Sequence, residues 1–128
     1  TALHYAVEEF HTDIVRLLVA RGASINVKTR ESGWMRTVGT PLHLAASHGN
    51  QQVADILLRA GADPNETDGD GYAPLHIASS YSSVGVARLL LGSGARPGAL
   101  TKWGKTPLAL AETEEMKELL RSVAHPKE

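Results

Sequence analysis

A short segment recurs four times along this chain, and its spacing limits the possible folds more than any other feature. The copies are Thr1-Ala2-Leu3-His4-Tyr5-Ala6, Thr40-Pro41-Leu42-His43-Leu44-Ala45, Ala73-Pro74-Leu75-His76-Ile77-Ala78 and Thr106-Pro107-Leu108-Ala109-Leu110-Ala111. They begin 39, 33 and 33 residues apart. Self-similarity at such a period is typical of proteins built from stacked repeats. The sequence therefore predicts an array of four similar units.

The second unit predicts two short helices. Thr40 is suited to be an N-cap. Pro41 is suited to the first helical position, because a backbone N–H there would have no partner within the helix. Gly49 suits the end of this helix because glycine readily takes a positive φ. A second helix is expected from about Gln51 to Gly61. Its broad apolar face would be formed by Val53, Ala54, Ile56, Leu57 and Leu58.

Each helix pair is followed by a stretch rich in turn-forming residues. The longest such stretch runs from Gly61 to Gly71, and shorter counterparts begin at Gly22 and Gly94. Helices this short are marginal in water, so they depend on packing against the next unit. The predicted unit is therefore helix, helix and protruding loop.

With this period, the Thr-Pro-Leu-His-x-Ala segment and the Gly-Ala-x-x-Asn turn at Gly22 and Gly61, the chain resembles the ankyrin repeat family. The resemblance covers nearly the whole chain. It implies an all-α helical solenoid of about four helix-turn-helix repeats joined by β-hairpin-like loops. Residues 1–128 then form a single domain, with units at 1–27 (truncated at the N-terminus), 28–67 (with a six-residue insertion), 68–100 and 101–125.

Two departures from the repeat lead to expectations about the ends. No hairpin precedes Thr1, which predicts that the chain is part of a longer parent. In the last unit the linking glycine is replaced by an acidic segment, residues 112–115. Here we expect a shortened closing repeat that ends near Ala124 and has a polar outer face. Its inward residues would be Met116, Leu119 and Leu120, and its outward residues Glu118 and Arg121.

Composition excludes several classes of function. Thirteen basic and 14 acidic residues give a net charge of -1, so no strong field attracts nucleic acid or an anionic membrane. The chain has no cysteine and no apolar run long enough for a membrane span. We expect a cytoplasmic or nuclear monomer whose partner is a protein, with neither nucleic-acid binding nor membrane insertion.

The residues that suggest enzymatic or metal chemistry have simpler structural explanations. His4, His43 and His76 occupy the same position in successive units, and stacked helices about 8 to 10 Å apart would keep them from sharing one ion. Each is expected instead to make a hydrogen bond that stabilises the start of its helix. The sequence also has no recognisable nucleophile motif. It therefore predicts a protein that is not an enzyme and has no metal or cofactor.

Three local motifs also fail as ligand or modification sites. Residues 98–106 resemble a phosphate-binding loop, but five residues separate Gly98 from Gly104 where that loop requires four. Residues 68–71 resemble a calcium loop, but Ile77 would replace the bidentate glutamate. Residues 65–67 match a glycosylation acceptor, which turn chemistry at Asn65 explains better.

The resemblance implies that a partner would bind the concave face formed by the loop tips and the exposed sides of the first helices. The predicted partner-binding residues are Glu8, Glu9, Trp34, Met35, Arg36, Ser47, His48, Asp70, Tyr72, Ser80, Tyr81, Lys102, Trp103 and Lys105. Four of the six aromatic residues are in this set, and such residues are frequent at interface hot spots. An alternative is that they brace neighbouring loops. The enlarged loop 28–39, with charges of +3 and −1, is either a basic finger for an acidic partner or a neutral insertion.

Three hypotheses about function follow. The first is a scaffold or adaptor that holds a segment of a partner protein. The second is a targeting or regulatory portion of a larger enzyme or channel. The third, implied by the resemblance alone, is that Asn26 and Asn65 are sites of hydroxylation.

Overall fold

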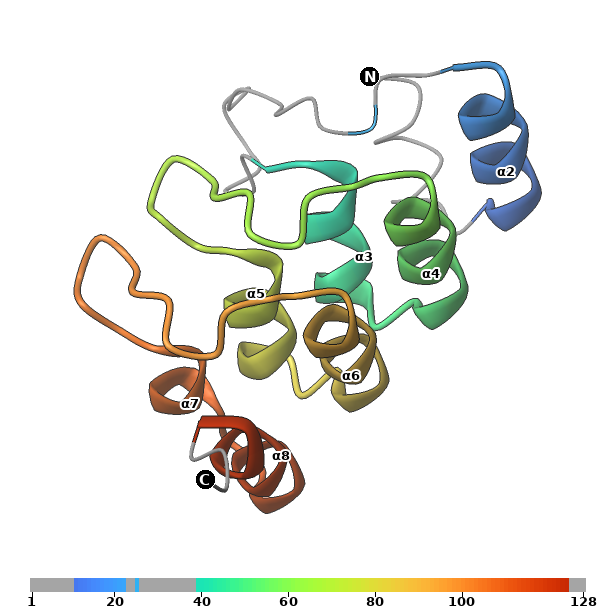
Figure 1. The fold of residues 1–128 in the computed structure, drawn as a ribbon. Helices are drawn as coiled ribbons and strands as arrows, with labels where there is room; N and C mark the ends of the chain where they lie inside the picture. Colours follow the sequence, from blue (N-terminus) through green and yellow to red (C-terminus); the bar gives the residue numbers. More distant parts are fainter. Residues whose placement is uncertain (1–10, 23–24, 26–38, 125–128) are drawn as a thin grey trace.

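The computed structural model describes residues 11–22, 25 and 39–124, and within these ranges it contains helices and no strands (Figure 1). None of these helices is long and apolar enough to cross a membrane. The helices α2, α4, α6 and α8 form one layer, and α3, α5 and α7 form a second layer beside it. Their bounds are Thr12–Ala20 (α2), Pro41–His48 (α3), Gln51–Arg59 (α4), Pro74–Ser80 (α5), Val84–Gly92 (α6), Pro107–Leu110 (α7) and Glu114–Ala124 (α8).

In the second unit the starts of both helices and the end of the first are as predicted, whereas α4 ends at Arg59, two residues before the predicted Gly61. Thr40 is the N-cap of α3, with an extended backbone, and Pro41 is the first helical residue. The helix ends at Gly49, which adopts a left-handed conformation with φ of 67°. The following helix, α4, begins at Gln51, and its N-cap Asn50 accepts a hydrogen bond from the N–H of Val53.

The hydrophobic core lies between the two layers and continues from one unit to the next. Buried leucines recur at equivalent positions, as Leu42 and Leu75 in the first helices and Leu57 and Leu90 in the second helices. Ala45 and Ala78 are also buried, and their small side chains let neighbouring helices approach closely. The packing of α3 on α5 and of α4 on α6 buries faces that a single unit would expose. The predicted solenoid is confirmed.

The last helix pair differs from the others as predicted. Its first helix, α7, has only four residues, whereas α8 has 11. Met116 and Leu120 are buried, Leu119 is half-buried, and Glu118 and Arg121 are exposed. The expected inward and outward faces of the closing repeat are thereby confirmed.

Candidate partner-binding surface

Two buried histidines, one on α3 and one on α5, connect these first helices to the hairpins that follow them in the next unit. The Nδ1 atom of His43 accepts a hydrogen bond from the N–H of Thr40, and that of His76 accepts one from Ala73, each at 3.0 Å. Since Nδ1 accepts, the proton of each neutral ring lies on Nε2. From there His43 donates to the carbonyl of Tyr72 at 2.7 Å. The predicted bond at the helix start is confirmed, and a second bond to the next unit accompanies it.

His76 makes the corresponding connection to the last hairpin. Its Nε2 lies 2.9 Å from the carbonyl oxygen of Ala99 and 3.1 Å from that of Lys105. Burial lowers the pKa of His76, although these two carbonyls and the charge of Asp68 act in the opposite direction. A neutral His76 suits its position, because a proton on Nδ1 would repel the N–H of Ala73.

Two hairpin tips, residues 68–72 and 101–105, are each closed around one side-chain oxygen. In the first, Oδ1 of Asp68 accepts from the N–H groups of Asp70 and Tyr72, both at 2.9 Å. In the second, Oγ1 of Thr101 accepts from Trp103 at 3.3 Å and from Lys105 at 3.2 Å. These bonds hold both tips in a defined conformation.

Four of the predicted residues meet where the two tips touch. The N–H of Lys102 donates to the carbonyl of Asp70 at 2.9 Å, and the two side chains form a loose ion pair at 3.9 Å. The rings of Tyr72 and Trp103 meet edge to face, with centroids 6.0 Å apart. The ammonium group of Lys102 lies 5.5 Å from the centre of the Trp103 ring. Tyr72 is half-buried by these contacts, whereas Trp103 remains 58% exposed.

The predicted residues of the first helices lie at the opposite end of α3 and α5 from the hairpins. Tyr81, which follows α5, is 60% exposed, and Ser80 and His48 are also exposed. Ser47 is half-buried and donates its hydroxyl to the carbonyl of Leu44 at 2.9 Å. Tyr81 and Trp103 are therefore separated by the length of a first helix and do not form one cluster.

Comparison with known protein families agrees with this architecture. A model for three copies of the ankyrin repeat matches residues 29–101, and a model for a single ankyrin repeat matches residues 1–30. The chain belongs to the ankyrin repeat family.

Several proteins with different functions are similar to parts of this ankyrin chain. Human protein phosphatase 1 regulatory subunit 27 is 43% identical over 70 residues, which are 55% of this chain and 42% of that protein. The NF-kappa-B inhibitor cactus of Drosophila melanogaster is 43% identical over 56 residues, which are 44% of this chain and 10% of the inhibitor. Palmitoyltransferase AKR1 of Kluyveromyces lactis is 40% identical over 72 residues, which are 56% of this chain and 9% of the enzyme. The chain thus matches less than half the length of each of these relatives.

Some residues predicted to form the partner-binding surface of this ankyrin array lie outside the described residues. The prediction also missed one exposed apolar residue near a hairpin tip. Glu8, Glu9, Trp34, Met35 and Arg36 belong to the first group, as do His4 and Asn26. The missed residue is Leu100, which is 62% exposed beside the last hairpin tip. Its signal was present in the sequence, because a leucine there interrupts a turn-forming stretch outside the repeated core pattern.

Asn65, the other residue for which hydroxylation was considered, connects two ankyrin turns. Its side-chain amide donates to the carbonyl of Gly94 at 3.0 Å, and its oxygen accepts from the N–H of Arg96 at 2.9 Å. Its own N–H donates to Oδ1 of Asp63 at 2.9 Å. Asn65 therefore has a structural role between successive turns.

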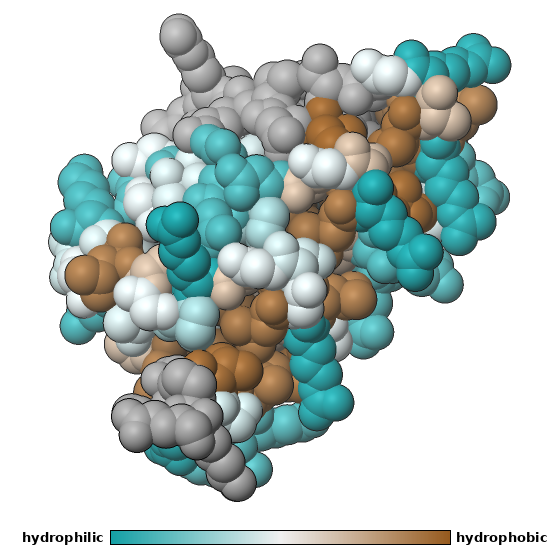
Figure 2. All heavy atoms as spheres, in the orientation of Figure 1, coloured by the Kyte–Doolittle hydropathy of each residue, from teal (hydrophilic) through white to brown (hydrophobic). Residues whose placement is uncertain are grey.

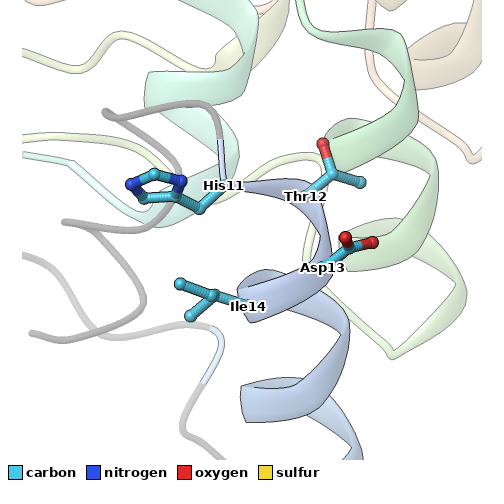
Figure 3. Close-up of a pocket in the computed structure, with 4 residues that line it drawn as sticks. All are labelled: His11, Thr12, Asp13 and Ile14. Atoms are coloured by element: carbon cyan, nitrogen blue, oxygen red, sulfur yellow. The ribbon is translucent and has the colours of Figure 1, made fainter.

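A hollow of about 400 Å³ lies at the start of α2, lined by His11, Thr12, Asp13 and Ile14 (Figure 3). The side chains of His11 and Ile14 point to one side of the chain, and those of Thr12 and Asp13 point to the other. They do not converge on a common point. In the described part of the chain, no three His, Asp or Glu residues are grouped so that they could hold a metal ion.

Proposed function

We propose that this ankyrin array is a non-catalytic scaffold or adaptor that binds a segment of a partner protein through its hairpin tips and the exposed ends of α3 and α5. The observation that carries the proposal is the position of Trp103. Its ring is 58% exposed, yet it contacts Tyr72 on one hairpin and Lys102 on its own hairpin. A large exposed aromatic side chain with restricted motion favours binding, because little conformational entropy is lost on association.

The surroundings of Trp103 suggest how the contact would be made. Exposed Leu100 adds apolar area, while Lys102 and Lys105 offer positive charge and Asp70 offers negative charge nearby. Apolar contact at the centre with charged groups around it is the usual arrangement of a protein interface. Tyr81 would form a second anchor at the far end of α5. A partner segment that reaches both must run along the first helices.

The experiment uses Trp103 as its own probe. In a Trp34→Phe background the only tryptophan is Trp103, so its fluorescence should change when a captured partner binds. Trp103→Ala and Tyr81→Ala, made with Trp34 retained, should each weaken binding about tenfold, as expected for interface anchors. Arg59→Ala, on an exposed position of α4, is the matched control and should bind normally.

Thermal unfolding separates binding from stability in these variants. Trp103→Ala and Tyr81→Ala should unfold at nearly the same temperature as the parent, because both side chains are mostly exposed. A large loss of melting temperature with unchanged affinity would refute the assignment of these residues. The relatives named as a regulatory subunit and an inhibitor are compatible with a role in binding other proteins.

The alternative function is a regulatory or targeting portion of a larger enzyme or channel. The match to a palmitoyltransferase favours it, because the matched segment is only 9% of that enzyme. Under this alternative, Trp103→Ala in the complete polypeptide should change the activity or location of an attached domain. A complete coding sequence without any further domain would exclude it.

A further inference from the structure

The helices α2, α4 and α6 can be compared residue by residue, because each has nine residues and the starts are 39 and 33 residues apart. Ile14, Val53 and Val86 share the third position of these helices. Val15, Ala54 and Ala87 share the fourth position, and Leu17, Ile56 and Leu89 share the sixth. In α8 the segment from Met116 to Leu120 has the same apolar pattern as the segment from Val86 to Leu90, so Met116 corresponds to Val86.

The third position is buried in every helix of this layer except α2. Val53, Val86 and Met116 are each 0% exposed, whereas Ile14 is 46% exposed. Leu17 at the sixth position is 49% exposed, whereas Ile56 and Leu89 are half-buried. The helices pack in the order α2, α4, α6, α8, so among the described residues α2 has a neighbour in this layer on one side only. The third position of each of these helices therefore lies on the side of the preceding unit.

The opposite end of the array has a different surface. The fourth position is fully buried as Val15, Ala54 and Ala87, which places it on the side of the following unit. In α8 this position is Lys117, whose ammonium group lies 3.7 Å from the carboxylate of Glu114. A charged residue there gives this end of the described array a polar face. The α2 end, by contrast, retains the apolar residues of an internal junction, and Figure 2 shows hydrophobic surface at α2.

We infer that the Ile14–Leu17 face of α2 is a stacking surface for one further helix pair of the same repeat type, supplied by the same polypeptide upstream. The face continues the interface already formed by α2 on α4 and by α4 on α6. The incoming second helix should carry a small apolar residue at its fourth position, as Val15, Ala54 and Ala87 do at the three described junctions. The hollow beside Ile14 offers room for side chains from such a helix.

A second copy of this chain fits the face less well. Two copies related by a two-fold axis would place Ile14 and Leu17 against the same residues of the other copy. The described junctions instead pair unlike faces, with the fourth-position side of one helix toward the third-position side of the next. We therefore assign the face to an upstream repeat.

Cysteine labelling can test this assignment, because the chain contains no cysteine. Ile14→Cys is prepared in the 128-residue chain and in the polypeptide made from the complete coding sequence, and both are treated with a thiol reagent. In the shorter chain the thiol should react readily. In the complete polypeptide it should react at least about tenfold more slowly, since a packed helix must open before labelling.

Two controls calibrate the rates. Val53→Cys, at the same position of α4, should be protected in both polypeptides, and Tyr81→Cys should react in both. Circular dichroism verifies that each variant is folded. Equal labelling of Ile14→Cys in the two polypeptides would overturn the inference. Protection in the 128-residue chain that rises with concentration, together with a dimer mass in sedimentation, would assign the face to a second copy and also overturn it.

Discussion

The hairpin tips 68–72 and 101–105 have the same backbone arrangement with different side chains. In each, the first residue donates its N–H to the carbonyl of the fifth at 2.9 Å, as Asp68 to Tyr72 and Thr101 to Lys105. The carboxylate of Asp68 accepts two further bonds at 2.9 Å, whereas the hydroxyl of Thr101 accepts its two at 3.2 and 3.3 Å. Hydrogen bonds to an ionised acceptor are shorter and stronger. The position in the repeat thus determines the backbone, and the side chain determines how firmly it is held.

The surroundings of the two tips differ more than the hydrogen bonds within them. The first tip is covered by the second, and a Cβ atom added at Gly71 would lie 2.9 Å from the backbone nitrogen of Lys102. At Gly104, the equivalent position of the second tip, such an atom would meet nothing within 4 Å. The fifth residue of each tip follows this difference, since Tyr72 is half-buried and its equivalent Lys105 is exposed. Exposure at the fifth tip position thus depends on whether another tip covers it.

The largest loss of stability should come from replacing the histidine that supports the second tip. His76→Ala removes the acceptor for the N–H of Ala73 and the donor for the carbonyls of Ala99 and Lys105 in a buried position. We expect a loss of about 3 kcal/mol in the free energy of unfolding, measured with urea. His43 supports the first tip through its bond to the carbonyl of Tyr72, and His43→Ala should cost less, about 2 kcal/mol. A larger loss for His43→Ala would contradict this account of the supports.

Replacing each of the two equivalent glycines by alanine should distinguish the cost of backbone strain from the cost of steric crowding. Both residues have a positive φ, 80° for Gly71 and 74° for Gly104. Gly104→Ala should lose about 1 kcal/mol of stability from backbone strain alone. Gly71→Ala should lose about 2 kcal/mol, because the new methyl group also pushes against the backbone of the second tip. Equal losses, determined by the same urea titration, would show that the second tip moves away without cost.

The helices could be predicted from the sequence because their signals are local. Thr40, Pro41 and Gly49 specify the start and end of α3 through the backbone conformations that they favour. The burial of Met116 and Leu120 followed from helical periodicity in the same way.

The details of the candidate surface could not be predicted, because they depend on contacts between units. The second hydrogen bond of His43 is to the carbonyl of Tyr72, 29 positions away in the sequence. Sequence patterns do not specify how residues so far apart are placed in space. The same holds for the contact of Tyr72 with Trp103, which joins residues of two different hairpin tips. Local signals in the sequence predicted both Tyr72 and Trp103 as partner-binding residues, although only Trp103 is largely exposed.

The rule that position determines the backbone can be tested at the other end of the first helices. Ser82 has a φ of 58°, and its equivalent after α3 is Gly49, with a φ of 67°. Ser82→Gly should stabilise the protein by about 0.5 kcal/mol, because relief of the strain exceeds the added freedom of the unfolded chain. Gly49→Ser should destabilise it by more than this amount, because its Cβ atom would also lie 3.2 Å from the hydroxyl of Ser83. Thermal unfolding measures both, and a destabilised Ser82→Gly would show that the turn does not carry this strain.

The smallest expected effect is the response of the second tip to pH. Burial lowers the pKa of His76 in the folded protein below its ordinary value of 6.5, which the unfolded chain retains. Below pH 6.5 the unfolded state therefore binds a proton that the folded state does not, and stability falls as the pH falls. Between pH 7.5 and 6.0 this linkage is limited to less than about 1 kcal/mol for one group. Above pH 7.5 the contribution of His76 should be constant.

Urea titrations at several pH values measure this slope, and a glutamine variant assigns it. His76→Gln keeps an acceptor and a donor without a titrating group, so part of the slope between pH 7.5 and 6.0 should disappear. If His76→Gln retained the full slope, the acid sensitivity would belong to another group, and the stability of the second tip would not depend on a neutral His76.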